Sequence, residues 1–247
     1  MPRLKILAPL LGLVTVFGLF SGGCGGLFCY EVRGPITQWS YHISPFSKIR
    51  VYNSPQIYIL QGDSQSVVVE SEENMFQALL FHIDPFGERL YIDFDETCID
   101  DIDHFKIFIT VDTLKEIDLR AGGEVWVEDT MHTDSLIVLI SGNAEANLDL
   151  LDANYIETNI SGSGEVRYHG IDTVTSHIMN ISGIGSVFSY GLQNQNVSIN
   201  VSGAALIQTS VHNQLDVSIS GTADVYYKGN PSIIQNIAGS GQLIDAN

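Results

Sequence analysis

The stretches NISGSGEV (159–166), NISGIGSV (180–187) and NVSGAALI (200–207) repeat one pattern, in which an apolar residue precedes a small residue and a glycine. When the small residue before the glycine is taken as the marker, seven copies occur at intervals of 20, 20, 21, 20, 18 and 18 residues. The markers are Ala121, Ser141, Ser161, Ser182, Ser202, Ser220 and Ala238. Near-constant spacing over seven copies is the signature of a repeat protein, in which each copy forms one structural unit.

Positions around the marker share their composition. The fifth residue after it is always apolar, and the third is small in six copies, with Glu124 as the exception. The residue before the marker is apolar in six. The fifth residues are Trp126, Ala146, Val166, Val187, Ile207, Val225 and Leu243. The first copy, AGGEV (121–125), therefore departs from the pattern of the others.

Alternation between the markers indicates strands. In VSINVSG (197–203), Val197, Ile199 and Val201 lie on one face of an extended chain and the intervening polar residues on the other. One such strand cannot bury its apolar face alone, but copies stacked roughly 4.8 Å apart form a continuous sheet over a continuous core. Twenty residues at roughly 3.3 Å each give a coil of about 66 Å, enough for two or three short strands. The pattern predicts an all-β parallel β-solenoid of about seven coils.

The repeated glycines are expected to be the bends of this solenoid. A bend favours glycine because glycine accepts positive φ, and because a Cβ would crowd the coils above and below. The expected bend glycines are Gly122, Gly142, Gly162, Gly183, Gly203, Gly221 and Gly239. Two residues before the marker, Asn159, Asn180, Asn200 and Asn236 share one position and predict a ladder of amide hydrogen bonds between coils.

The chain before the repeat is predicted to form short strands. Apolar residues alternate within KIRVYN (48–53), QIYILQG (56–62), SVVVESE (66–72), RLYIDFD (89–95), FKIFITV (105–111) and EIDLRA (116–121). The stretch ENMFQALLF (73–81) fits either a helical turn or an irregular strand, and no long helix is expected. Residues 25–42 contain several glycines and no clear period, which predicts a tether.

The first residues are typical of export. Arg3 and Lys5 precede an apolar run over 6–20, which is short for a membrane span. The following SGGC resembles the lipobox at which bacterial signal peptidases cut before a cysteine that is then lipidated, here Cys24, although Ser21 stands where the pattern prefers leucine. Ordinary signal cleavage is the alternative. We expect a lipoprotein signal peptide over 1–23, a lipidated cysteine and tether over 24–43, and one solenoid domain over 44–247.

Lipidation of Cys24 would leave two further cysteines, Cys29 and Cys98. An oxidising compartment allows them to form a disulfide, while Cys29 in a glycine-rich tether could equally stay unpaired. The sequence leaves both alternatives open.

Charge excludes one class of partner. The formal net charge is −18, and from residue 121 onward 13 acidic residues face only Arg167 and Lys228. Nucleic-acid binding requires clustered Lys and Arg to displace counterions from phosphates, so no nucleic-acid partner is expected.

Candidates for catalysis are few. The acidic stretch DETCIDDID (95–103) offers Asp100, Asp101 and Asp103 as weak metal ligands, but it lacks the spacing of an EF-hand loop, so a solvated acidic loop is favoured. Seven histidines share no coil position, and no nucleophile-elbow or phosphate-loop motif is present. We therefore expect no catalytic residue, metal or cofactor.

The order of these stretches resembles a known family. FSKIRVYNSPQIYILQGDSQSVVVESEEN (46–74), LYIDFD (90–95) and FKIFITVDTLKEIDLRAGGEVWV (105–127), followed by the Ser-Gly repeats, are similar to the bacterial family named putative auto-transporter adhesin, head GIN domain, over about residues 44–245. The resemblance implies a right-handed parallel β-solenoid and an exported lipoprotein. Gly25, after the lipidated cysteine, then implies the outer membrane or cell surface, with the periplasm as the alternative. The resemblance carries over no catalytic residue.

Two functions remain in view. The favoured one is a non-enzymatic envelope lipoprotein, held to the membrane by its lipid anchor, whose rigid solenoid contacts a glycan or a surface protein. The alternative is a β-helix enzyme, a lyase or hydrolase, acting on a polysaccharide. Aligned carboxylates beside an aromatic platform would favour the enzyme, and candidates for that platform are Tyr168, Tyr190, Tyr226 and Tyr227.

Overall fold

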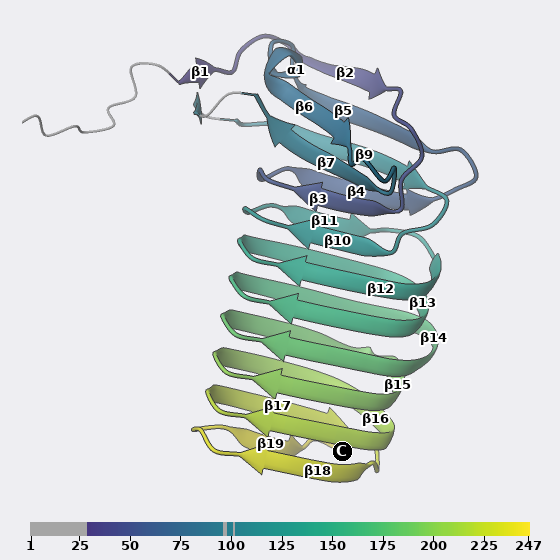
Figure 1. Ribbon diagram of the computed structural model, residues 1–247, viewed down its shortest axis with the longest axis vertical. Coiled ribbons are helices and arrows are strands. Elements are labelled where there is room, and N and C mark those ends of the chain that lie inside the picture. The colour runs from purple at the N-terminus through teal and green to yellow at the C-terminus, as the bar shows by residue number, and fades with distance from the viewer. Residues whose placement is uncertain (1–28, 96–97, 101) are drawn as a thin grey trace, which may run out of the picture.

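The computed structural model describes residues 29–95, 98–100 and 102–247 of the chain. It is an all-β structure with 69% strand, and the single helix of the described residues, α1 (Met75–Ala78), has four residues. Figure 1 shows a tall stack of coils below an irregular N-terminal portion, which we call the cap. The predicted fold class is confirmed.

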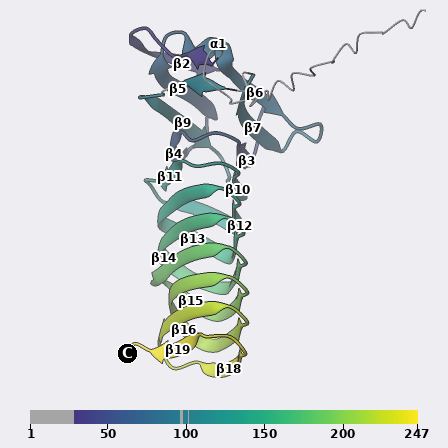
Figure 2. The ribbon, with the colours of Figure 1, turned by 90° about the vertical axis from the view of Figure 1, so that its left-hand side faces the viewer.

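The solenoid consists of parallel strands stacked coil on coil (Figures 1 and 2). Its strands are β10 (Glu116–Leu119), β11 (Glu124–Val127), β12 (Met131–Ile140), β13 (Asn143–Ile160), β14 (Ser163–Ile181), β15 (Ile184–Val201), β16 (Ala204–Ile219), β17 (Thr222–Lys228), β18 (Ser232–Ile237) and β19 (Gln242–Asp245). The seven bends enclose about six turns. Segments that follow a bend form one sheet, the post-bend sheet, and segments that precede a bend form the opposite, pre-bend sheet.

The long strands pass from one sheet to the other at the corner opposite the bends. Register between coils is continuous near the bends and shifts at this corner, for example between Leu148 and Tyr155 of β13 and between Ser189 and Asn196 of β15. Coils of 18, 20 and 21 residues therefore stack with their bends aligned.

The cap extends both sheets in an order different from that of the chain. β3 (Lys48–Val51) and β4 (Gln56–Gln61) stack in parallel on β10 and β11, and β7 (Arg89–Phe94) and β9 (Phe105–Val111) stack on β3 and β4. Antiparallel strands then close this end: β5 (Ser66–Glu72) on β9, β2 (Ile36–Tyr41) on β5, and β6 (Leu79–Ile83) on β7. Two further short strands, β1 (Tyr30–Glu31) and β8 (Ile99–Asp100), pair beside the cap.

The interior follows the predicted alternation. Val197, Ile199 and Val201 are at most 3% exposed, whereas Ser198 and Asn200 face outward. Equivalent residues of every coil form one apolar core from the cap to the C-terminal coils. Stacking thus buries the face that a single strand could not bury alone.

Of the two reasons given for glycine at the bends, crowding is right and positive φ is wrong. None of the seven expected bend glycines has positive φ. Instead, a Cβ added to Gly203 would lie 1.9 Å from the carbonyl oxygen of Gly183, and one added to Gly183 would lie 2.0 Å from that of Gly162. Side chains are excluded because the backbones of successive bends touch.

The first bend lies one residue earlier than the sequence pattern placed it. A Cβ on Gly142 would meet the carbonyl oxygen of Ala121, so Ala121, and not Gly122, occupies the stacked glycine position. Val125, paired with Ala146, is the buried fifth residue, whereas Trp126 points outward. This shift removes the two exceptions noted above, because Gly123 becomes the small third residue and Leu119 the apolar residue before the marker. The first copy then differs from the others in having Arg120 as its marker and Ala121 in place of the bend glycine.

Arg120 therefore takes the marker position of the first bend, where later coils have serine or alanine. Its guanidinium Nε lies 2.7 Å from Oδ1 of the buried Asp118, and Nε of Arg50 lies 2.6 Å from Oδ2. This ion-pair group joins β3 of the cap to β10 of the first coil. Because Asp118 is buried, removal of either arginine would leave its carboxyl group with one ion-pair partner fewer.

The asparagine ladder is confirmed over three coils. The side-chain amide of Asn180 donates to Oδ1 of Asn159 at 2.8 Å, and that of Asn200 donates to Oδ1 of Asn180 at 3.0 Å. Asn236 lies beyond this ladder, because the intervening coil has Ser218 at the shared position.

Two boundaries differ from the sequence prediction. Residues 36–41, assigned to the tether, form β2, whose strand pairing with β5 makes it part of the folded unit. The ambiguous stretch 73–81 contains both alternatives, because the helical turn α1 leads directly into β6.

A string of polar side chains runs inside the apolar core. Oγ1 of Thr158 lies 2.8 Å from the hydroxyl of Tyr168 and 3.0 Å from Nε2 of His177. Burial lowers the pKa of His177 to about 3 and raises that of Tyr168, while the neighbouring Asn194 side chain opposes the shift at His177. His177 is therefore a neutral ring at neutral pH.

Candidate functional site

Stacking turns equivalent outward positions into rows along the solenoid axis. On the post-bend sheet, Glu124 of β11 pairs in register with Glu145 of β13, which pairs with Glu165 of β14. Gln56 precedes this row and Ser186 follows it. Three carboxylates thus lie in a line over three consecutive coils, with neutral polar residues at both ends.

This row lies in an open groove of about 590 Å³ that crosses five strand layers. Its other lining residues include Ser54, Asn143, Ser163 and the exposed Ile184. Five layers at roughly 4.8 Å give a groove about 20 Å long. Hydroxyl, amide and carboxylate groups supply hydrogen-bonding partners along its length.

Arg167 partly balances the charge of the row. Its guanidinium pairs with Glu165 and lies 3.8 Å from Glu145, which also accepts a hydrogen bond from Asn147 at 3.0 Å. Within the described part of the chain, the Glu124 side chain has no ion-pair or hydrogen-bond partner. The N-terminal half of the groove is therefore its more negative half.

An aromatic row lies two residues further along the same strands. The rings of Phe108, Tyr58 and Trp126 stack with centroid separations of 5.2 and 5.1 Å and interplanar angles of 16° and 12°. Their edges are partly open to solvent, so they form a rigid apolar strip over β9, β4 and β11. Of the three carboxylates only Glu124 shares a strand with this strip, because the residues two positions after Glu145 and Glu165 are Asn147 and Arg167. In the same row, Arg167 lies 4.6 Å over the ring of Phe188.

The predicted tyrosine platform is only half right. Tyr168 is fully buried in the core, and Tyr227 packs against the core. Tyr190 and Tyr226 do lie on the outer face of the post-bend sheet, and Lys228 lies 4.5 Å over the Tyr190 ring. Burial, and then the neighbouring Tyr226, raise the pKa of Tyr190.

Sequence reasoning missed the carboxylate row and the main aromatic row. The carboxylate row was visible as an acid four positions after the markers Ser141 and Ser161. The aromatic row had no such signal, because β4 inserts between β9 and β11 and brings together rings that are far apart in the chain.

The acidic loop gives no metal site in the described residues. Asp101 lies outside them, Asp103 is exposed, and no group of three or more potential ligands is found where the structure describes the chain. Of the seven histidines, His177 is the buried one described above.

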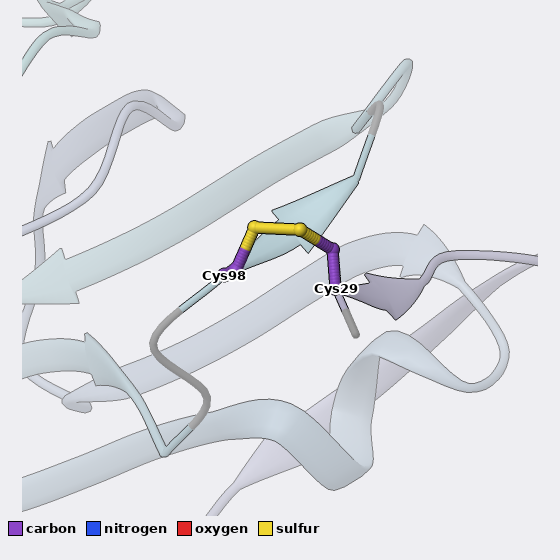
Figure 3. Close-up of a disulfide and its surroundings, with 2 residues drawn as sticks. All are labelled: Cys29 and Cys98. Atoms are coloured by element: carbon purple, nitrogen blue, oxygen red, sulfur yellow. A yellow bond between two sulfur atoms is a disulfide. The ribbon is translucent and has the colours of Figure 1, made fainter. Parts of the chain in front are cut away.

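The structure joins Cys29 and Cys98 in a disulfide (Figure 3). The bond ties the segment before β1 to the segment before β8, and the backbone N–H of Tyr30 donates to the carbonyl of Cys98 at 2.9 Å. The chain is thereby fixed beside the cap from Cys29 onward. Cys24 lies outside the described residues. No helix among those described is long and apolar enough to cross a membrane.

These features define a repeat protein with an extended polar surface groove and an aromatic strip next to its N-terminal end. The family model named putative auto-transporter adhesin, head GIN domain, matches residues 45–231, and the chain belongs to this family. Membership of an adhesin-head family indicates an extracellular or surface protein and suggests a non-enzymatic role. No curated protein matches the chain in sequence.

Solved structures share the fold. A putative adhesin from Bacteroides fragilis matches with a TM-score of 0.82 and 20% identity, over 87% of this chain and 99% of its own. A putative lipid binding protein from Parabacteroides distasonis matches with a TM-score of 0.72 and 20% identity, over 89% of this chain and 100% of its own. A putative adhesin from the same species matches with a TM-score of 0.68 and 19% identity, over 89% of this chain and 100% of its own. At these identities the likeness establishes the fold alone.

Proposed function

We propose that the protein is a non-enzymatic envelope lipoprotein whose post-bend groove binds an extended glycan chain. The proposal rests on the row of Glu124, Glu145 and Glu165 in a 590 Å³ groove, whose N-terminal end adjoins the aromatic strip at Glu124. Carboxylates accept hydrogen bonds from sugar hydroxyls, and the solvent-exposed edges of the aromatic strip add apolar contact area at one end of the groove. Membership of an adhesin-head family supports this assignment.

Charge selects the class of glycan. The groove is lined by three carboxylates, of which Glu165 pairs with Arg167, on a chain of net charge −18, so sulfated or uronic acid polymers are repelled. A neutral or amino-bearing polysaccharide meets no such barrier. The groove, about 20 Å long, would hold several sugar units of such a polymer.

The carboxylate row favours binding over hydrolysis. Glycoside hydrolysis needs two carboxyl groups that flank the scissile bond from opposite sides of the sugar. Glu124, Glu145 and Glu165 occupy equivalent positions on one face and would contact the same side of a bound chain. Enzymatic activity is therefore the weaker alternative, although aligned carboxylates are present and Glu124 has aromatic rings beside it.

Binding to immobilised neutral, amino-bearing and sulfated polysaccharides tests the proposal. We expect binding to a neutral or amino-bearing polymer, and a loss of at least tenfold in affinity in Glu124→Gln and Trp126→Ala. Glu157→Gln, which changes an acid of the opposite sheet, is the matched control and should bind normally. Equal binding by all variants, or preference for the sulfated polymer, would overturn the groove assignment. Release of reducing ends would support the enzyme instead.

The anchor is the second part of the proposal. Lipidation at Cys24 would hold the protein at the outer membrane or cell surface, with the solenoid exposed for contact. Radiolabelled palmitate should follow the protein and be lost in Cys24→Ala, which should be released in soluble form. Release of the parent protein from membranes by salt alone would contradict the anchor and leave a periplasmic protein.

A further inference from the structure

The two ends of the solenoid differ. The N-terminal end is closed by α1 and the antiparallel strands β2 and β6. At the C-terminal end, β18 pairs with β16 and β19 with β17, and among the described strands neither has a partner on its other side. Figure 1 shows this last coil at the foot of the stack. The unpaired edges present backbone N–H and C=O groups that can bind another strand.

Core positions of the last coil lack the cover that earlier coils receive. Ile233 of β18 is 39% exposed, whereas Leu215, which pairs with it one coil earlier, is fully buried. Ile237 and Leu243 are also partly exposed, while Ile219 and Val225 before them are buried. One more layer of strand would bury these side chains as the earlier coils are buried.

The open end is also the uncharged end. Residues 229–244 contain no charged side chain in a chain of net charge −18, and Asp245 is the one acid that follows. Natural sheet edges are usually protected by lysine or by charges that block pairing, and β18 has neither. Two copies of this acidic protein meet least repulsion if they approach through this end.

We propose that the C-terminal coil is a docking surface for a second copy of the chain, paired end to end about a two-fold axis. Such an axis makes the facing edge strands antiparallel, which satisfies the edge groups of both copies. The capped N-terminal end offers no matching parallel edge, so the contact closes as a dimer and does not grow into a filament.

Size sets the strength of this contact. A strand of about 20 Å and two sheets about 10 Å apart give an end face of about 400 Å² per copy with the side chains included. The total of about 800 Å² lies below the standard size of stable interfaces and in the range of transient contacts, so a weak, reversible dimer is expected.

The consequence for adhesion rests on the proposed lipid anchor. The disulfide at Cys29 fixes the start of the described chain beside the cap, five residues after Cys24. Five residues span at most about 18 Å, so an anchor at Cys24 stays near the cap end. A dimer joined through its C-terminal coils then has its two anchors at opposite ends and bridges two membrane surfaces.

Sedimentation equilibrium and small-angle X-ray scattering on the mature chain from 10 µM to 1 mM, roughly the range expected for a contact of this size, test the dimer. We expect a monomer–dimer equilibrium in which the maximum dimension approximately doubles. Ile234→Lys, at a side chain 61% exposed on β18, should weaken dimerisation at least tenfold. Leu206→Lys, at an exposed apolar residue of a middle coil, is the matched control and should dimerise normally. A monomer at 1 mM, or equal weakening by both variants, would overturn the proposal.

A vesicle assay tests the bridging. The chain, carrying a histidine tag before residue 25, is attached to phosphatidylcholine vesicles that contain a nickel-chelating lipid. Vesicles that carry the parent protein or Leu206→Lys should cluster, and vesicles that carry Ile234→Lys should not. Clustering unaffected by Ile234→Lys would contradict bridging through the C-terminal coil. Glycan binding by Ile234→Lys should be unchanged, so failure of this inference is distinguishable from failure of the proposed function.

Discussion

A Cβ on Gly203 would lie 1.9 Å from the carbonyl oxygen of Gly183 on the preceding coil. The same contact recurs from Gly162 to Gly239, each bend resting on the backbone of the one before it. The bend column is therefore a line of direct backbone contacts along the solenoid.

Gly203→Ala should strongly destabilise the folded protein because of this backbone contact. A methyl group at this site can be placed only by moving the backbone of two coils, so we expect a loss of about 3 kcal/mol or more in the free energy of unfolding. Chemical denaturation measures it. The control is Gly62→Ala, where the added Cβ meets one side-chain carbon, Cγ2 of Thr110 at 3.0 Å, and no backbone atom. Equal losses at the two sites would show that bend crowding is not the constraint.

The asparagine ladder should contribute to stability through Asn180. This side chain donates to Asn159 and accepts from Asn200, so Asn180→Ala removes two hydrogen bonds and should cost about 1–2 kcal/mol. Asn236→Ala, at the same coil position but outside the ladder, should cost well under 1 kcal/mol. Urea denaturation of both variants checks this difference, and a reversed order would contradict the ladder.

His177 should make stability depend on pH. Its folded pKa of about 3 lies below the ordinary value of 6.5, so the unfolded chain binds a proton that the folded chain does not between these values. The stabilisation is complete above pH 6.5 and is lost as pH falls, by up to about 1.4 kcal/mol per unit. Denaturation midpoints from pH 7 to pH 4 should fall less steeply for His177→Gln than for the parent. Parallel profiles would show that His177 is not buried as a neutral ring.

The disulfide should stabilise the cap. It closes a loop with a sequence separation of 69 residues, for which chain-entropy reasoning gives about 4 kcal/mol as an upper figure. Cys98→Ser should expose the cap to proteolysis and leave the coils after residue 121 protected. Thiol titration of the unreduced chain starting at residue 25 should find no free sulfhydryl. Two free sulfhydryls would show that Cys29 and Cys98 are not joined in a disulfide.

The repeat was predictable because the pattern that defines it lies within short stretches of the sequence. Period-two alternation and bend spacing are visible in single strands, and the same alternation, counted from Ser161, already places Tyr168 on the inner face with Val166. The error at the first bend arose because two glycines follow Ala121 and conceal which residue carries the backbone contact.

The candidate site was less predictable because its parts come from different regions of the chain. Stacking of Phe108, Tyr58 and Trp126 depends on β4 entering between β9 and β11, and no spacing in the sequence records this order. The tether prediction failed similarly, since β2 is a strand only through its pairing with β5.

The corner opposite the bends has a consequence for how such a chain can change over evolutionary time. Register between coils is strict at the bend column and shifts at that corner, where coils of different length are accommodated. Residues can therefore be gained or lost there without disturbing the alignment of the groove, whose row of carboxylates lies next to the bends. The two edges of the molecule thus differ in the changes they can accommodate: the bend edge requires a fixed geometry, whereas the opposite corner accepts loops of different length.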